Sequence, residues 1–167
     1  EREVIPFHEG VHVVKTDATS IVETYYLQIK VDGLQYVSSA RAVLTGMVGS
    51  NRFGRNERVT STPASLYFTL QKSDDKGVDV LATVFNTFGR IEDITNCLSV
   101  TFDIRTTDGR TVKRDFDITS LFSSEACLKH HWLLLEETVK IDPPASSGGG
   151  FDPSVDDWED EHHDIKL

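Results

Sequence analysis

Histidine pairs are the residues of this sequence whose type and spacing suggest metal chemistry. His162 and His163 stand among acidic residues near the end of the chain, and His8 and His12 stand near its start. Adjacent strand residues point to opposite faces, so His162 and His163 would not share one ion. On one strand face His8 and His12 would lie about 13 Å apart, too far for a shared metal. We predict no metal site and no cofactor; for the acidic tail a solvated face is the main interpretation and weak calcium association the alternative.

Nucleophilic catalysis would require an exposed serine or cysteine in a strained turn, with a base beside it. The sequence has no Gly-x-Ser-x-Gly elbow, and no glycine-rich phosphate loop precedes a helix. His130 and His131 adjoin Trp132 and are expected to be structural residues at the start of a strand. We therefore predict no catalytic residue and a protein that is not an enzyme.

Aromatic residues are the remaining candidates for ligand chemistry. A sugar-binding sheet face could be lined by Tyr26, Tyr36, Tyr67, Trp132 and Trp158. Most aromatic residues on strands, however, pack in the core or lie half-buried. A glycan-binding face is therefore an alternative and not the leading interpretation.

The composition indicates a soluble globular chain with one domain. Its 167 residues suffice for one core, and 38% hydrophobic and 26% charged residues are typical of a folded protein. No stretch approaches the length of about 18 apolar residues that a membrane helix needs. The net charge of -10 argues against nucleic acid as a partner, because phosphate binding needs a basic face. The chain begins at Glu1 without a methionine, so we interpret it as a processed or trimmed fragment.

Cys97 and Cys127 allow at most one disulfide. Each adjoins an expected strand, so a bridge between them is geometrically possible. Two buried free thiols are the commoner outcome for such a pair. Both arrangements stay open from the sequence.

Alternation of apolar and polar residues with a period of two dominates the chain. The pattern is clearest in residues 98–104 and again in residues 112–118. Asp108 and Gly109 lie between these runs and tolerate the positive φ of a tight turn. The pattern predicts a β-hairpin with one solvated face.

Other segments complete an all-β prediction. Further strands are expected in residues 23–31, 65–72, 78–89 and 130–141, and less clearly in residues 37–49. Residues 49–65 are polar and punctuated by Gly and Pro, which predicts a long loop, and residues 118–131 could hold one short helical turn. About seven short strands with frequent turns predict an antiparallel two-sheet β-sandwich.

The end of the chain has its own character. We expect a β-sandwich domain over residues 1–142, a Pro/Ser/Gly linker over 143–150, and an acidic segment over 151–167. The last segment carries a net charge of -6 and also five apolar anchors, Phe151, Val155, Trp158, Ile165 and Leu167. A fully disordered tail would not need these anchors. We therefore predict that they dock on the same domain, with donation to a partner as the alternative.

Three stretches resemble surface proteins of the Bacteroidales fimbrillin superfamily. Residues 25–50 resemble a strand and short turn followed by an Ala-x-Leu-x-Gly-Met motif, which this sequence has as "AVLTGM". Residues 98–122 resemble a recurring unit of strand, Asp-Gly, strand and Asp-Ile-Thr. Residues 148–167 are similar to a glycine-rich ending with spaced Phe, Val, Trp, Ile and Leu. The resemblance is strongest to the fimbrium-anchoring subunit and related surface lipoproteins.

The resemblance implies a transthyretin-like, Greek-key β-sandwich at the bacterial cell surface, anchored to the outer membrane. It implies a role in anchoring or assembling a fimbrium by exchanging β-strands with other fimbrial subunits or surface proteins, and it supplies no catalytic residues. Such proteins carry a lipidated cysteine and often two domains. This chain shows no lipidation segment and has no room for a second full domain, so a lipid anchor would lie outside it. The alternative function is a secreted carbohydrate-binding β-sandwich module.

Overall fold

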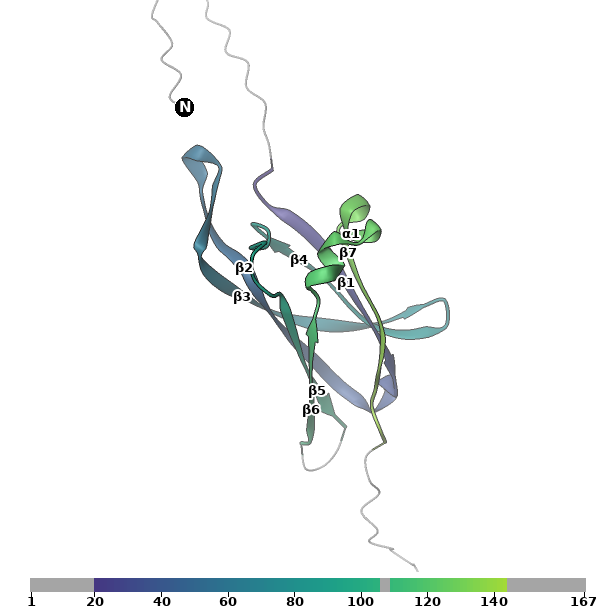
Figure 1. The fold of residues 1–167 in the computed structure, drawn as a ribbon. Coiled ribbons are helices and arrows are strands. Elements are labelled where there is room, and N and C mark those ends of the chain that lie inside the picture. The colour runs from purple at the N-terminus through teal and green to yellow at the C-terminus, as the bar shows by residue number, and fades with distance from the viewer. Residues whose placement is uncertain (1–19, 106–108, 144–167) are drawn as a thin grey trace, which may run out of the picture.

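The computed structural model describes residues 20–105 and 109–143, and it shows seven strands in a single sheet (Figure 1). The strands are β1 (Glu23–Asp32), β2 (Val37–Arg52), β3 (Glu57–Asp75), β4 (Val78–Thr87), β5 (Cys97–Ile104), β6 (Thr111–Asp117) and β7 (Trp132–Lys140). The connections contain the 3-10 turns η1 (Leu34–Tyr36), η2 (Phe53–Arg55) and η3 (Thr119–Ser123) and the short helix α1 (Glu125–His130). No helix in the described part of the chain is long and apolar enough to cross a membrane.

The sheet is mixed, with the strand order β6-β5-β2-β3-β4-β1-β7. Neighbouring strands are antiparallel except for β1 and β7, which run parallel from Tyr26 opposite Trp132 to Asp32 opposite Lys140. The sheet curls into a half-barrel. The all-β prediction is thus confirmed, but the prediction of an antiparallel two-sheet sandwich is wrong.

Strand β3 explains why one sheet replaces the two that were expected. Its pairing with β2 ends at Leu70, opposite Ala40, and its pairing with β4 begins at Gln71, opposite Ala82. One strand of 19 residues therefore changes neighbours midway. Because strands twist, its two halves lie at different angles, and the strand carries the sheet around the curl.

The long loop predicted over residues 49–65 is also wrong. Strands β2 and β3 continue through it as a hairpin, turning at Asn56 in the left-handed conformation (φ 48°). Pro63 pairs with Val48 and lies in the half of β3 that has a neighbour on one side only. Proline is tolerated at such an edge, since its missing N–H can point away from the ladder.

The core lies inside the curl and follows the predicted alternation. Its fully buried large side chains include Leu27, Ile29, Leu44, Leu81, Leu98, Phe102 and Leu133. The segment η3–α1 packs against this core through Phe122 and Cys127, near β7. It confirms the predicted short helical region. Ser124 caps α1, and His131 ends it in the left-handed conformation (φ 58°).

The hairpin of β5 and β6 is confirmed, with Cys97 opposite Asp117 and Asp103 opposite Thr111. Gly109 has the expected positive φ (68°), while Asp108 lies outside the described residues. Cys97 and Cys127 are both free, which settles the question that the sequence left open.

Candidate binding surface

The five predicted docking residues, Phe151, Val155, Trp158, Ile165 and Leu167, all lie outside the described residues. Their docking and the division of the chain into domain, linker and closing segment therefore remain predictions. The described body instead offers two surfaces of its own. They are the free edge of β7 and the outer face of the sheet beside it.

Strand β7 has an open backbone edge. The Tyr26 N–H donates to the His131 carbonyl at 3.0 Å, which fixes the register of the parallel pair. Backbone groups alternate sides along a strand, so those of Leu133 face β1 and those of Trp132 and Leu134 point away. Within residues 20–105 and 109–143, no strand pairs with that outward side.

The two edges of the sheet differ in character. At the β6 edge, Lys113, Arg114 and Asp115 are all exposed, and charged residues at an edge oppose the addition of a further strand. Residues 132–135 of β7 read Trp-Leu-Leu-Leu without a charge. The register with β1 shifts only after Leu135. The uncharged first half of β7 is therefore the better edge for strand pairing.

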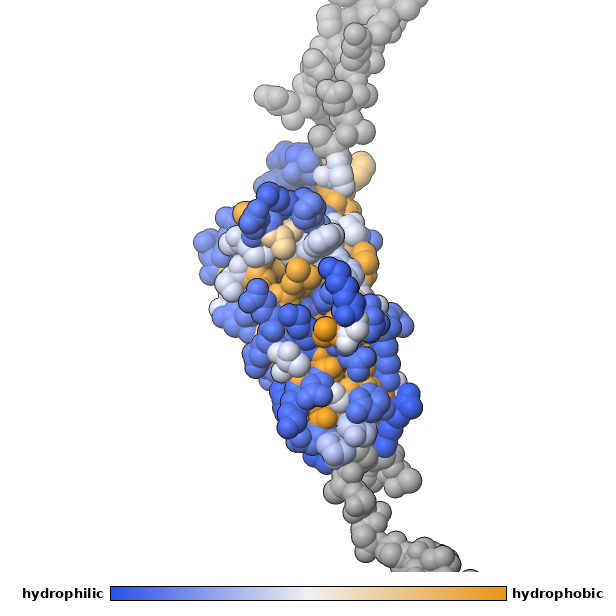
Figure 2. Space-filling view, turned by 90° about the vertical axis from the view of Figure 1, so that its right-hand side faces the viewer, coloured by the Kyte–Doolittle hydropathy of each residue, from blue (hydrophilic) through white to orange (hydrophobic). Residues whose placement is uncertain are grey.

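The outer face of β1 and β7 carries an aromatic pair, Tyr26 and Trp132. Their ring centroids lie 6.4 Å apart at an interplanar angle of 67°. The tip of the β3–β4 hairpin reaches this face, because Gln28 Nε2 donates to Asp75 Oδ2 at 3.1 Å. Figure 2 views the molecule from the side on which β7 and this hairpin lie in Figure 1, and hydrophobic patches alternate there with hydrophilic residues.

A hollow of about 540 Å³ lies between the hairpin tip and the aromatic pair. We call it the outer hollow, and it is lined by Tyr26, Gln28, Asp75, Lys76, Trp132 and Leu134. The sequence singled out Tyr26 and Trp132 but missed the polar members. The Asp-Lys-Gly tip indicates a turn, but nothing in the sequence shows that this turn approaches β1.

A larger hollow of about 760 Å³ lies where β3 and β4 diverge. We call it the seam hollow, and it is lined by Arg41, Ala42, Val43, Tyr67, Phe68, Thr69, Thr83, Val84 and Thr101. Phe68 and Phe85 stack across the divergence, with centroids 5.0 Å apart, and so join the two halves of the curl. Tyr67 is 79% exposed. Tyr36, one of the aromatic residues considered for the alternative sugar-binding face, packs against the core, and Trp158 lies outside the described residues.

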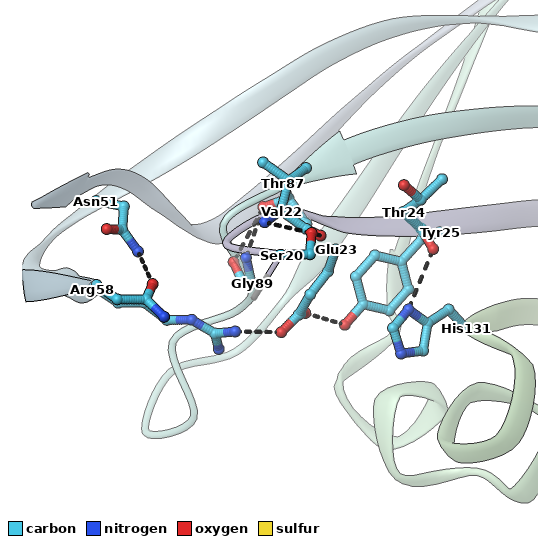
Figure 3. Close-up of polar contacts among 11 residues, drawn as sticks. Ser20, Val22, Glu23, Thr24, Tyr25, Asn51, Arg58, Thr87, Gly89 and His131 are labelled. Atoms are coloured by element: carbon cyan, nitrogen blue, oxygen red, sulfur yellow. Dashed lines mark hydrogen bonds and ion pairs between the residues drawn. The ribbon is translucent and has the colours of Figure 1, made fainter. Parts of the chain in front are cut away.

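A polar cluster fixes the start of β1 to its surroundings (Figure 3). The Tyr25 hydroxyl donates to Glu23 Oε2 at 2.6 Å, and the Arg58 guanidinium forms an ion pair with Glu23 Oε1. The His131 ring stacks on Tyr25 at 5.0 Å, and its Nδ1 lies 3.3 Å from the Thr24 carbonyl oxygen. The cluster links β1, β3 and the end of α1.

Burial is the main cause that raises the pKa of Tyr25 above its usual range, and its hydrogen bond to Glu23 raises it further. Burial likewise raises the pKa of the Cys127 thiol, with a smaller contribution from the charge of Glu23. Both groups therefore hold their protons at neutral pH. The Glu23 carboxylate is engaged by both Tyr25 and Arg58, so the cluster positions strands and does not present a free base.

Comparison with known proteins identifies a similar fold but no family. No protein-family profile matches the sequence, and no curated protein matches it. A solved structure, that of a putative adhesin from Bacteroides ovatus ATCC 8483, is similar with a TM-score of 0.56 and 17% sequence identity. The match covers 74% of this chain and 49% of that chain, so this chain spans about half the length of the adhesin. The similarity shows that the two share a fold.

Proposed function

We propose that this chain is a non-catalytic adhesion and assembly module of a bacterial cell surface, which accepts a β-strand from a partner along β7. Addition of a strand to a free sheet edge is a general mode of peptide recognition, in which backbone hydrogen bonds supply affinity. The observation that carries the proposal is the outward, uncharged edge at Trp132 and Leu134. The partner would be another fimbrial subunit or surface protein.

Two further observations support this function. The fold is shared with a protein named as a putative adhesin from Bacteroides ovatus, and three stretches of the sequence resemble surface proteins of the Bacteroidales fimbrillin superfamily. Of the two outermost strands, β6 carries exposed charges, so a partner strand would add at β7 and not at β6. More specifically, we propose that the chain helps to anchor a fimbrium at the outer membrane, through a lipid anchor that lies outside this chain.

Photo-cross-linking tests the accepting edge in cells that display the protein. A benzophenone amino acid at position 134 should cross-link to an extended segment of another protein, and mass spectrometry should place that segment beside β7. The same substitution at Lys113, on the charged β6 edge, is the matched control and should give little product. Cross-links from position 134 only to residues 151–167 of the same molecule would show that the chain covers its own edge, and the proposal would fail.

Proline at position 134 tests the role of the backbone itself. The Leu134 N–H points away from β1, so Leu134→Pro removes an outward donor and leaves the β1–β7 ladder in place. We expect a folded protein that no longer forms the inter-subunit cross-link, with the benzophenone then placed at Glu136. Leu133→Pro removes a ladder donor in the core and should unfold the chain. Unchanged cross-linking in the folded Leu134→Pro variant would contradict strand addition.

A further inference from the structure

We propose that the outer hollow binds a neutral carbohydrate, a short oligosaccharide of pyranose rings. Its volume of about 540 Å³ falls within the range of about 300–1,000 Å³ typical of small-ligand sites. The site uses side chains on the face of the sheet, whereas strand addition uses the backbone at its edge. The inference therefore goes beyond the proposed function and does not depend on it.

The rings of Tyr26 and Trp132 form one wall of the hollow, which we call the aromatic wall, and this wall is the first reason for this ligand class. Trp132 is 46% exposed although it is a large apolar residue. Its ring contacts that of Tyr26, with centroids 6.4 Å apart, and that of His130, with centroids 4.8 Å apart, so it needs little ordering when a ligand arrives. A pyranose ring has a face of C–H groups that packs on an indole and releases water from both.

The polar groups are the second reason. The Tyr26 hydroxyl donates to Gln28 Oε1 at 3.0 Å, and Gln28 Nε2 donates to Asp75 Oδ2 at 3.1 Å. This chain of bonds fixes the plane of the amide beside the aromatic wall. Asp75 keeps acceptor capacity on its carboxylate, and the Lys76 ammonium supplies donors next to it. Adjacent sugar hydroxyls, each both donor and acceptor, suit such a mixed set.

Charge decides between neutral and acidic sugars. Within the outer hollow the charges of Asp75 and Lys76 offset each other. The chain as a whole has a net charge of -10, so it repels polyanions at long range. A uronic acid polymer would meet this repulsion without a basic cluster in the hollow to offset it. The lining therefore favours a neutral glycan.

Tryptophan fluorescence gives a direct test. The sequence has two tryptophans, so Trp158→Phe in the full chain leaves Trp132 as the only reporter. Cellohexaose, xylohexaose and mannohexaose would be titrated as neutral probes, with polygalacturonate as the acidic comparison. We expect saturable quenching or a blue shift with at least one neutral probe and no saturable change with polygalacturonate.

Calorimetry on variants of the full chain then assigns the site. Trp132→Ala and Gln28→Ala should each weaken binding at least tenfold, and circular dichroism should confirm that they stay folded. Tyr67→Ala removes a more exposed tyrosine from the seam hollow and should bind as the parent does. Gln28 lies on β1 and not at the open edge of β7, so Gln28→Ala should weaken glycan binding and leave strand cross-linking from position 134 intact.

Three results would overturn the inference. They are no saturable response to any of the neutral probes, binding to polygalacturonate alone, or equal affinity in the parent and the folded Gln28→Ala variant. None of these outcomes bears on the strand-accepting edge, which the cross-linking experiment tests separately.

Discussion

At the scale of single residues, Tyr25 combines a packing role and a polar role. Its ring contacts Phe85 and Phe122 in the core, with centroids 5.7 and 5.5 Å away, while its hydroxyl reaches Glu23. A buried hydroxyl needs a partner, and here the partner is a carboxylate that Arg58 also holds. The residue therefore joins the core to the surface at the point where the described chain begins.

Tyr25 should make the stability of the protein sensitive to alkali. The unfolded phenol ionises near its ordinary pKa of 10.0, whereas burial raises the pKa in the folded state, so the folded state retains the proton. The contribution of Tyr25 is fully present below pH 10 and is lost as the pH rises above it. Tyr25→Phe should cost about 1 kcal/mol at pH 7, from the lost hydrogen bond, and should make the alkaline loss of stability shallower.

Urea denaturation between pH 7 and pH 11 measures this effect. Tyr67→Phe is the matched control. Because Tyr67 is exposed, this substitution should change neither the stability at pH 7 nor the loss of stability at alkaline pH. The Cys127 thiol, whose pKa burial also raises, contributes a separate loss that begins near pH 9.0. An alkaline slope in Tyr25→Phe equal to that of the parent would show that Tyr25 does not retain its proton.

At the scale of elements, the connection between β4 and β5 is held to β2 by two backbone hydrogen bonds, from Val48 to Gly89 and from Ile91 to Gly46, and by the side chain of Asn96. Asn96 is fully buried, and its Nδ2 donates to the Gly46 carbonyl at 2.9 Å. Gly46 has a left-handed backbone (φ 80°), and a Cβ there would lie 2.6 Å from Asn96 Nδ2 and 2.8 Å from the Thr95 carbonyl oxygen. The glycine is needed both for its conformation and for this close approach.

Alanine substitutions separate these two requirements. Gly77 has a similar φ (84°) at the β3–β4 turn but open space around it. Gly77→Ala should therefore cost about 1–2 kcal/mol, from the left-handed backbone alone. Gly46→Ala should cost about 3 kcal/mol or more, because the Asn96 contact must also give way. If chemical denaturation gave the same loss of unfolding free energy for Gly46→Ala and Gly77→Ala, β2 and the β4–β5 connection would relax around the new Cβ without cost.

The sequence predicted elements well where burial alone determines the pattern. In β1 and β5 the inward side chains alternate strictly, and both strands appear as expected. In residues 49–65 the hairpin reaches past most of the core, so its side chains are largely exposed and no alternation marks it. Gly and Pro in that stretch therefore favour a loop in a prediction from sequence. In the structure Pro63 lies in the part of β3 that pairs with β2 on one side only.

At the scale of the whole molecule, the topology was not predictable from these patterns. Alternation shows which face of a strand is buried, but not which strand lies beside it. The curl depends on β3 changing neighbours at Gln71, and the parallel pair depends on β7 returning to β1 from about 100 residues away. The outer hollow likewise depends on the β3–β4 tip reaching Gln28. Pairings over such sequence distances leave no local signal.

The parallel pairing of β1 and β7 determines how the molecule would bear tension. The described chain begins where β1 begins and ends where β7 ends, so these two points lie at opposite ends of the molecule (Figure 1). A pull applied between them slides β1 against β7 along their length. The interstrand bonds are then loaded together, and none can open before the others.

Single-molecule stretching should reveal this resistance. With handles at Ser20 and Pro143 we expect a high unfolding force, set by the simultaneous rupture of the β1–β7 bonds. With handles at Gln35 and Pro143, beside the ends of the two strands that pair at Asp32 and Lys140, the bonds open one at a time, and the force should be several-fold lower. Equal forces in the two geometries would exclude the strand pair as the load-bearing element. A module held at one end and pulled at the other, as in an adhesive fibre under flow, would meet the load along its resistant direction.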